Sequence, residues 1–185
     1  MPNWADCELR ITGDSARLKE IEDRMGESHD LTVFKPIPKE LENTLSGAAT
    51  CDNTGEHITC GKATDFNEKI GIPSKYVGFT AEEQATLLLE HGALNWYDWS
   101  QKNWGAKWPP SNVQFDNFGE EIFIRFDSPW APPIELIAAI AKQYPDLMFD
   151  LQAFEMGVGY HSHTQFEDGS CVFDEEYSYD GNRGG

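Results

Sequence analysis

Positive charge is scarce in this chain. Its 185 residues include 14 Lys and Arg against 32 Asp and Glu, which gives a formal net charge of −18 at pH 7. A surface with this excess of carboxylates repels nucleic acid and anionic lipid. We therefore expect no direct binding to DNA, RNA or a membrane. The charge itself fits plain solubility, adaptation to salt, or a partner that has a basic surface.

Long apolar runs and targeting signals are also missing. No stretch approaches the roughly 18–20 apolar residues that a membrane span requires, and the N-terminus lacks the basic start and apolar run of a secretory signal. We expect a protein of the cytoplasm. The four cysteines are far apart except for Cys51 and Cys60, and free thiols are the expected state outside a secretory context.

Familiar catalytic motifs are absent as well. The sequence has no Gly-Lys-Ser/Thr phosphate loop, no Gly-x-Ser-x-Gly elbow and no His-Glu-x-x-His helix. Paired carboxylates are too frequent in so acidic a chain to indicate a site. We predict a protein that is not an enzyme, with no catalytic residues, no cofactor and no bound metal.

Two groups of residues leave alternatives to that prediction. In the first, Cys51, His57 and Cys60 could supply three zinc ligands, with His29 or His163 as the fourth. Five residues separate Cys51 from His57, whereas zinc sites usually pair ligands about two to four residues apart. The spacing is therefore irregular for zinc.

The second group is a histidine pair. His161 and His163 stand one residue apart in an expected strand and so share a face, with Glu155 and Glu167 nearby in the sequence. Such a pair could transfer protons or hold a metal weakly. The simpler interpretation is that both histidines face solvent.

Tryptophan, by contrast, is abundant, and five of the six tryptophans fall within 35 residues. Each can bury about 150–250 Å², so a second aromatic core is one interpretation. Tryptophan also dominates interface hot spots, so an exposed binding surface of Trp99, Trp104 and Trp108 is the other. Trp130 stands among three prolines, and we expect it to plug the end of the core against the helix that carries Trp96 and Trp99.

Regular elements can be recognised along most of the chain. Residues 4–12 alternate as a half-buried strand does, and residues 15–26 have the apolar spacing of an amphipathic helix. Residues 27–78 show no sustained period, and 42–62 resemble a loop. A capping box of Thr80 and Glu83 then predicts a helix that ends near Gly92. The later elements expected are helices at 94–104 and up to about Tyr144, and strands at 112–116, 120–127, 147–155, 158–166 and 171–173.

The order of these elements predicts an α+β fold. Without residues 27–111 the order is strand, helix, strand, strand, helix, strand, which is the ferredoxin-like split βαβ arrangement with an antiparallel sheet. We predict a single domain over residues 1–173 with a large helical, Trp-rich insertion after the first helix, at about 27–111. Residues 174–185 are expected to form an acidic, Gly-rich tail that is either disordered or clamped.

Several short motifs occur in a characteristic order. They are Met1-Pro2-Asn3-Trp4, Pro36-Ile37-Pro38-Lys39-Glu40-Leu41, Asn95-Trp96-Tyr97-Asp98-Trp99, Asn103-Trp104-Gly105-Ala106-Lys107-Trp108, Ser128-Pro129-Trp130-Ala131-Pro132-Pro133 and Ala153-Phe154-Glu155-Met156-Gly157. Together they resemble the YubB-type ferredoxin-like domain family of phage and plasmid proteins. The resemblance implies a ferredoxin-like fold with an inserted helical region and residence on a mobile genetic element. It implies no catalytic residues.

The acidic residues suggest a function. Residues 146–180 contain nine Asp and Glu and no Lys or Arg, and rows of carboxylates can replace phosphates opposite basic side chains. We predict a non-catalytic binding protein of a phage or plasmid. It would inhibit a nucleic-acid-binding defence protein in the host cytoplasm, such as a restriction or CRISPR-type effector, by mimicking the charge of DNA. The expected contact residues are Glu155, Glu167, Asp168, Asp174, Glu175, Glu176 and Asp180.

An alternative function uses the aromatic insertion. In that interpretation the protein is an accessory or regulatory module of a mobile element, and its acidity serves only solubility. Trp99, Trp104 and Trp108 would then contact the partner, and binding would depend little on salt.

Overall fold

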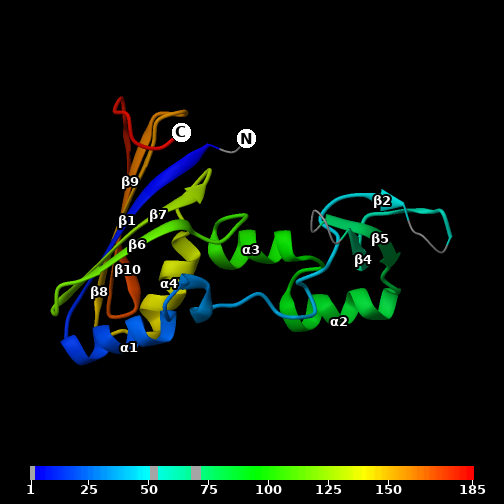
Figure 1. The fold of residues 1–185 in the computed structure, drawn as a ribbon, viewed down its shortest axis with the longest axis horizontal. Coiled ribbons are helices and arrows are strands. Elements are labelled where there is room, and N and C mark those ends of the chain that lie inside the picture. The colour runs from blue at the N-terminus through cyan, green and yellow to red at the C-terminus, as the bar shows by residue number, and fades with distance from the viewer. Residues whose placement is uncertain (1–2, 51–53, 68–71) are drawn as a thin grey trace. The chain divides into compact units, whose positions relative to one another are not determined.

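A computed structural model of the chain describes residues 3–50, 54–67 and 72–185 (Figure 1). The chain divides into two compact units. The first, here called the sheet unit, comprises Met1–Pro36 and Asn103–Gly185, and the second, the insertion unit, comprises Ile37–Lys102.

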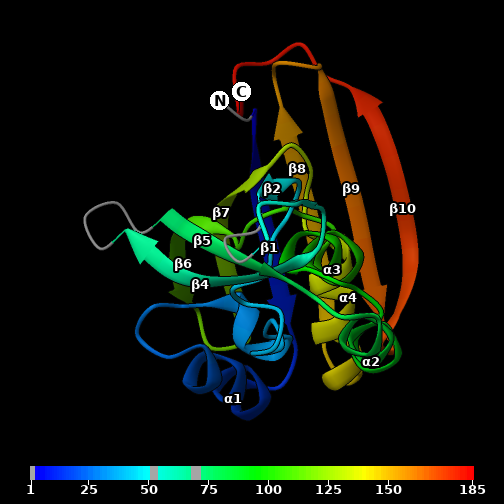
Figure 2. The same cartoon turned by 90° about the vertical axis from the view of Figure 1, so that its right-hand side faces the viewer.

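The sheet unit is built on a six-stranded antiparallel sheet with the strand order β10-β9-β8-β1-β7-β6. The strands are β1 (Trp4–Thr12), β6 (Ser111–Asn117), β7 (Glu121–Pro129), β8 (Met148–Glu155), β9 (Tyr160–Glu167) and β10 (Ser170–Ser178). Strand β10 forms one edge of the sheet, beside β9 (Figure 2). Strand β1 lies in the interior, between β7 and β8.

Two helices complete the ferredoxin-like arrangement. Helix α1 (Ser15–Met25) follows β1, and helix α4 (Ile134–Gln143) connects β7 to β8. The chain order β1-α1-β6-β7-α4-β8, with β8-β1-β7-β6 as neighbours, is the split βαβ topology. Strands β9 and β10 extend the sheet beyond β8. The predicted α+β, ferredoxin-like class is therefore confirmed.

Alternation along the strands places the core on one face of the sheet. In β1 the side chains of Cys7, Leu9 and Ile11 are fully buried, whereas Glu8 and Arg10 between them are not. The two helices cover the buried row with apolar side chains, as amphipathic helices do. These side chains are Leu18, Ile21 and Met25 of α1 and Leu136, Ile137, Ile140 and Ala141 of α4.

The insertion unit contains strands as well as the expected helices. Helix α2 (Ala81–His91) begins at the predicted capping box and ends at Gly92, whose φ of 68° a glycine adopts without strain. Helix α3 (Trp96–Trp104) starts in this unit. Two hairpins pair β2 (Ala49–Thr50) with β3 (His57–Ile58), and β4 (Gly61–Asn67) with β5 (Ile72–Gly78). Strands β2 and β3 have only two residues each and are too short to show a period, so the sequence suggested a loop at 42–62.

The boundaries of the insertion also differ from the prediction. We expected it to span about 27–111, but the compact unit spans Ile37–Lys102. A 3-10 helix at Leu31–Phe34 belongs to the sheet unit, where Leu31 and Phe34 are buried. In the described part of the chain, no helix combines the length and the apolar character needed to cross a membrane.

The tryptophans divide between core and surface. Trp104 is 2% exposed, and its indole N–H donates to the Lys35 carbonyl at 2.8 Å. Trp99 is also buried. Trp99 and Trp104 are thus core residues. The alternative prediction, which placed them with Trp108 on an exposed contact surface, is wrong for these two. Trp108 is 36% exposed.

The predicted role of Trp130 is also wrong. Its side chain is 47% exposed and lies against Trp108, with 5.6 Å between the ring centroids. Pro129 and Pro132 occupy the buried positions on either side of it. The backbone of Trp130 has a φ of 65°, which is unusual for a bulky residue. This backbone conformation directs the side chain out of the core.

The two environments predict different costs of substitution. Trp104→Ala should lower the free energy of unfolding by about 3–5 kcal/mol, because it empties a buried site and removes a hydrogen bond. Trp130→Ala should cost about 1 kcal/mol, since it removes only a partly exposed ring contact. Urea unfolding followed by circular dichroism measures both. Equal losses for the two variants would contradict this assignment of core and surface.

Thiol reactivity offers an independent check of the fold. Cys7 is buried in β1, and burial raises the pKa of its thiol well above the usual range. Cys171 is exposed at the start of β10. Iodoacetamide should therefore modify Cys171 in the native protein and Cys7 only after unfolding, as read by peptide mass spectrometry. Modification of Cys7 without denaturant would indicate that β1 is not central.

Candidate functional site

The face of the sheet opposite α1 and α4 carries a continuous set of polar and aromatic side chains. We call it the open face. The strand registers align its rows, with Glu8 opposite both Arg125 and Gln152, and Phe154 opposite His161. Its side chains are Asp6, Glu8 and Arg10 of β1, Glu121, Phe123, Arg125 and Asp127 of β7, Asp150, Gln152 and Phe154 of β8, His161, His163 and Gln165 of β9, and Phe173, Glu175 and Tyr177 of β10.

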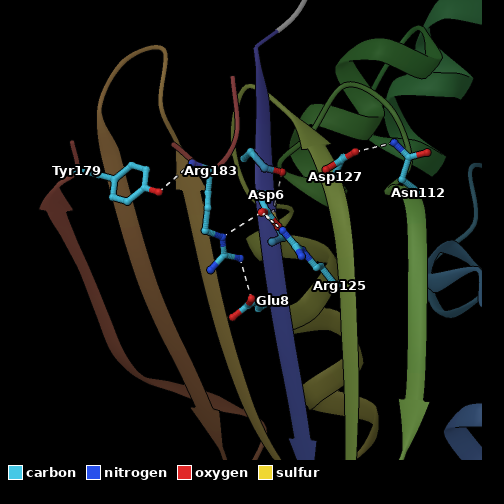
Figure 3. Close-up of polar contacts among 9 residues, drawn as sticks. Asp6, Glu8, Asn112, Arg125, Asp127, Tyr179 and Arg183 are labelled. Atoms are coloured by element: carbon cyan, nitrogen blue, oxygen red, sulfur yellow. Dashed lines mark hydrogen bonds and ion pairs between the residues drawn. The ribbon is translucent and has the colours of Figure 1, made fainter. Parts of the chain in front are cut away.

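At the centre of the open face, two arginines converge on Asp6 (Figure 3). Arg125 Nε donates to Asp6 Oδ1 and Arg183 Nε donates to Asp6 Oδ2, each at 3.0 Å. Arg183 Nη2 also donates to Glu8 Oε1 at 2.7 Å. Asp6 is only 7% exposed. Burial by itself would raise the pKa of Asp6, but the hydrogen bonds from Arg125 and Arg183 hold it below its usual range.

Aromatic rings continue this cluster toward β9. The guanidinium carbon of Arg183 lies 3.9 Å from the centroid of the Phe154 ring, a cation–π distance. The His161 ring is stacked on Phe154, with 4.3 Å between centroids and 10° between planes. Burial, and then electrostatic interaction with His163 and Arg183, lower the pKa of His161. These surroundings favour the neutral form of its ring.

A second polar cluster surrounds Asp150. His163 Nε2 lies 3.0 Å from Asp150 Oδ2, and Gln165 Nε2 donates to the same oxygen. Burial would raise the pKa of Asp150, but these hydrogen bonds lower it. The two predicted histidines thus share the open face. Their ring hydrogen bonds in the described structure go to Gln152 and Asp150, and the Tyr177 ring lies 5.6 Å from the His161 ring between centroids.

Arg183 reaches the open face from the end of the chain. Residues 179–185, here called the strap, fold back from β10. Tyr179 N–H donates to the Gly159 carbonyl and Gly185 N–H to the Trp4 carbonyl, each at 2.8 Å. Arg183 N–H donates to the Tyr179 hydroxyl oxygen at 2.9 Å, and Figure 3 shows the side chain directed at Asp6 and Glu8.

The expected tail at 174–185 therefore starts too early. Residues 174–178 belong to β10, because Asp174 through Ser178 pair with Thr164 through Tyr160 of β9. Acidic side chains on both faces hid this strand from sequence analysis, which relies on apolar alternation. Only the residues after Ser178 leave the sheet, and the hydrogen bonds of the strap clamp them.

One of the predicted acidic contact residues is buried. Glu155 has no exposed surface, and its carboxylate accepts hydrogen bonds from the N–H groups of Gly157 at 2.7 Å and Val158 at 2.6 Å. It forms the turn from β8 to β9. Glu155 is thus a structural residue, and its assignment to the contact surface is wrong.

The other six predicted acids, Asp180 of the strap among them, are exposed. Five of them lie on β10, in the turn that precedes it or at the last residue of β9, and we call these five the acidic edge. They are Glu167, Asp168, Asp174, Glu175 and Glu176.

The acidic edge differs from the cluster around Asp6 in its pairing. Asp174 accepts a hydrogen bond from Thr164 and Glu175 accepts one from Tyr177. Within the described ranges no carboxylate of the acidic edge forms an ion pair, whereas Asp6 and Glu8 are paired with arginine. Uncompensated negative charge is therefore concentrated on the edge strand.

The candidate zinc ligands that the structure describes do not form a recognisable group. Cys51 lies outside the described residues, and His57 and Cys60 belong to the insertion unit, exposed and half-buried respectively. His29 is stacked on Phe115 in the sheet unit, at 4.3 Å between centroids. Among the residues that the structure describes, no three His, Cys, Asp or Glu side chains are grouped to hold a metal ion.

The insertion unit has a pocket of about 580 Å³. Its walls mix two lysines and three glutamates with apolar and amide groups. Glu83, one of these glutamates, accepts a hydrogen bond from the Thr80 N–H in the helix cap. The lining residues are Lys39, Glu40, Asn43, Lys62, Ala63, Phe79, Glu82, Glu83, Thr86 and Leu87. Charges of both signs line it, so it does not favour a ligand of either sign.

Sequence reasoning missed the central residues of the open face, namely Asp6, Glu8, Arg125 and Arg183. One signal was available, because Arg183 is the single Lys or Arg after Lys142. A lone cation in so acidic a segment has many carboxylates to pair with. Its partners on β1, however, follow only from the fold.

The lowered pKa of Asp6 predicts a pH-dependent stability. An ordinary aspartate has a pKa of about 3.9 in the unfolded chain, and the folded value is lower. The ionised carboxylate therefore stabilises the fold fully above about pH 4, and this contribution disappears as pH falls through the folded pKa. Asp6→Asn should cost about 2 kcal/mol at pH 7. The difference from the wild type, measured by urea unfolding, should shrink as pH falls below about 4 and the carboxylate becomes protonated.

A matched control for this prediction is Asp116→Asn. Asp116 is exposed and has no ion pair among the described residues, so its substitution should change stability little at any of these pH values. A difference between Asp6→Asn and the wild type that persists at low pH would contradict the role of the ionised carboxylate.

Comparisons with known proteins agree with this topology. Residues 103–182 match a family model described as the ferredoxin-like domain in Api92-like protein. The crystal structure of protein Api92 from Yersinia pseudotuberculosis aligns over 96% of this chain and 99% of that chain, with a TM-score of 0.56 and 13% sequence identity. At this identity the likeness concerns the fold alone. No curated protein matches the sequence. The chain is thus similar to Api92-like proteins in its ferredoxin-like part, which supports the fold that the sequence motifs imply rather than the YubB-type family itself.

Proposed function

We propose that this protein is a non-catalytic acidic binding protein whose acidic edge captures the basic, nucleic-acid-binding surface of another protein. The observation that carries the proposal is the set of five exposed carboxylates of the acidic edge, which have no ion pair in the described structure. A net charge of −18 adds long-range attraction toward any basic surface.

The geometry of an edge strand suits this role. Side chains alternate between the two faces of a strand, so Glu175 points to the open face while Asp174 and Glu176 point to the other. A partner that approaches the edge therefore meets carboxylates on both faces. Such a row can replace phosphates opposite Lys and Arg, and the binding would weaken as salt screens the charges.

The positive charges of the sheet unit argue against direct nucleic-acid binding. Arg10 lies 3.7 Å from Glu121, and Arg125 and Arg183 are paired with Asp6. A nucleic-acid-binding sheet would instead present a basic stripe to the phosphates. The partner in this proposal is therefore a protein that itself binds nucleic acid.

The partner class rests on two features of the sequence. The motifs resemble those of phage and plasmid proteins, and the charge is that of a nucleic-acid mimic. A host restriction or CRISPR-type effector, whose basic groove is its working surface, fits both. The protein would then act in the host cytoplasm as an inhibitor that competes with DNA.

A second candidate function is supported by the exposed pair of Trp108 and Trp130. Lys107 Nζ lies 4.6 Å from the Trp108 ring and 5.7 Å from the Trp130 ring. Exposed tryptophans are favoured at interface hot spots. In this alternative the protein is an accessory module that binds its partner through these two rings, with little dependence on salt.

The acidic edge can be tested by neutralising it. In the variant Glu167→Gln/Asp168→Asn/Glu175→Gln/Glu176→Gln, capture of a basic protein from host lysate should be lost. The same capture by the wild type should weaken steeply between about 50 and 200 mM salt and be displaced by duplex DNA. Asn is chosen at position 168 because the residue has a φ of 50°, which Asn tolerates. Bound protein is quantified by mass spectrometry.

The matched control removes as many charges elsewhere. Glu27→Gln/Glu82→Gln/Asp116→Asn/Glu120→Gln alters four other exposed acids and should retain capture. Equal loss of capture in both variants would show that capture depends on net charge rather than on the acidic edge. Capture that ignores salt and DNA but is lost in Trp108→Ala would favour the accessory module instead.

A further inference from the structure

The guanidinium of Arg183 occupies a site whose parts belong to the sheet. Asp6 and Glu8 of β1 each accept a hydrogen bond from it, at 3.0 and 2.7 Å, and the Phe154 ring of β8 lies 3.9 Å from its central carbon. We propose that Asp6, Glu8 and Phe154 form a binding site for an arginine of the partner protein, and that Arg183 fills this site as an internal substitute. The inference rests on the proposed function, since it names the chemistry that a basic partner presents.

The site fits a guanidinium better than an ammonium. Asp6 and Glu8 are two residues apart on one face of a strand, about 7 Å along the chain, and they engage different nitrogens of one planar group. The same plane can lie over the Phe154 ring. A lysine ammonium is a compact point charge that can approach one carboxylate or the ring, but lacks the planar fork that contacts all three.

The site exists without the strap. Asp6, Glu8 and Phe154 are held by the paired strands β1 and β8, with Asp6 opposite Phe154. Asp6 also keeps a second partner, Arg125. Departure of Arg183 therefore leaves no unpaired buried charge, which would otherwise prevent opening.

The strap, in contrast, is not a strand of the sheet and is held by individual contacts. It carries no helix or strand, and Arg183 is its one cation. Gly184 permits the close approach, because its φ is 77° and a Cβ there would lie 2.3 Å from the Phe154 carbonyl oxygen and 2.7 Å from that of Trp4. A tethered group has an effective concentration in the millimolar range. An isolated arginine thus competes poorly, whereas a partner already held by the acidic edge competes well.

The test uses the peptides Ac-Gly-Arg-Gly-NH2 and Ac-Gly-Lys-Gly-NH2 as probes. Each is titrated into the ¹⁵N-labelled full chain while the backbone amide signals of Asp6, Glu8 and Phe154 are followed by NMR. Arg183→Gln should bind the arginine peptide at least about tenfold more tightly than the wild type, because the tethered competitor is gone. It should prefer the arginine peptide over the lysine peptide at least about fivefold. The double variant Glu8→Gln/Arg183→Gln should lose this binding.

Three results would overturn the proposal. They are equal affinities of the wild type and Arg183→Gln, equal affinities for the two peptides, and binding that persists in the double variant. If Arg183→Gln does not fold, Arg183→Lys keeps a positive charge beside Asp6 and should show the same order of affinities with a smaller gain. All these variants keep the acidic edge. Salt-sensitive capture of a basic protein without peptide binding would therefore contradict only the arginine site. Peptide binding without capture would sink only the proposed function.

Discussion

The sheet unit depends on β1, a central strand that is apolar on one side and ionic on the other. Cys7, Leu9 and Ile11 bury one row against the two helices, and that burial supplies the main driving force for packing. The opposite row places Asp6 almost out of solvent. A carboxylate there is tolerable because it is paired with arginine, since an unpaired buried charge is strongly destabilising. Arg125 on β7 and Arg183 of the strap both supply this pairing.

Negative charge is arranged in two different ways within the same sheet. At Asp6 and Glu8 of the open face it is neutralised locally, and these two acids act as hydrogen-bond acceptors that hold arginines in place. On the acidic edge it is left in solvent, where it acts over a distance set by the ionic strength. The first arrangement fixes the positions of side chains, and the second provides long-range electrostatic attraction. Together they suit a binding surface that first draws a partner in and then selects among its side chains.

Sequence patterns predicted what depends on neighbours in the chain and missed what depends on folding. The alternation of residues 4–12 and the capping box at Thr80 are local signals, and both elements formed as expected. Glu155 resembled any other acid until a turn placed two amides against it. Arg183 lies 177 residues after Asp6, a separation that no local pattern reports. The side to which Trp130 turns is likewise set by one backbone angle rather than by composition.

The acidic edge also bears on how this protein behaves toward copies of itself. Strand β10 ends the sheet, and an edge strand presents open backbone groups on which another chain can add a strand. Carboxylates on both faces of β10 place like charges opposite one another in any such pairing between two copies. The residues that we propose to attract a basic partner would thus also oppose such pairing between copies, and acid or high salt would weaken both effects at once.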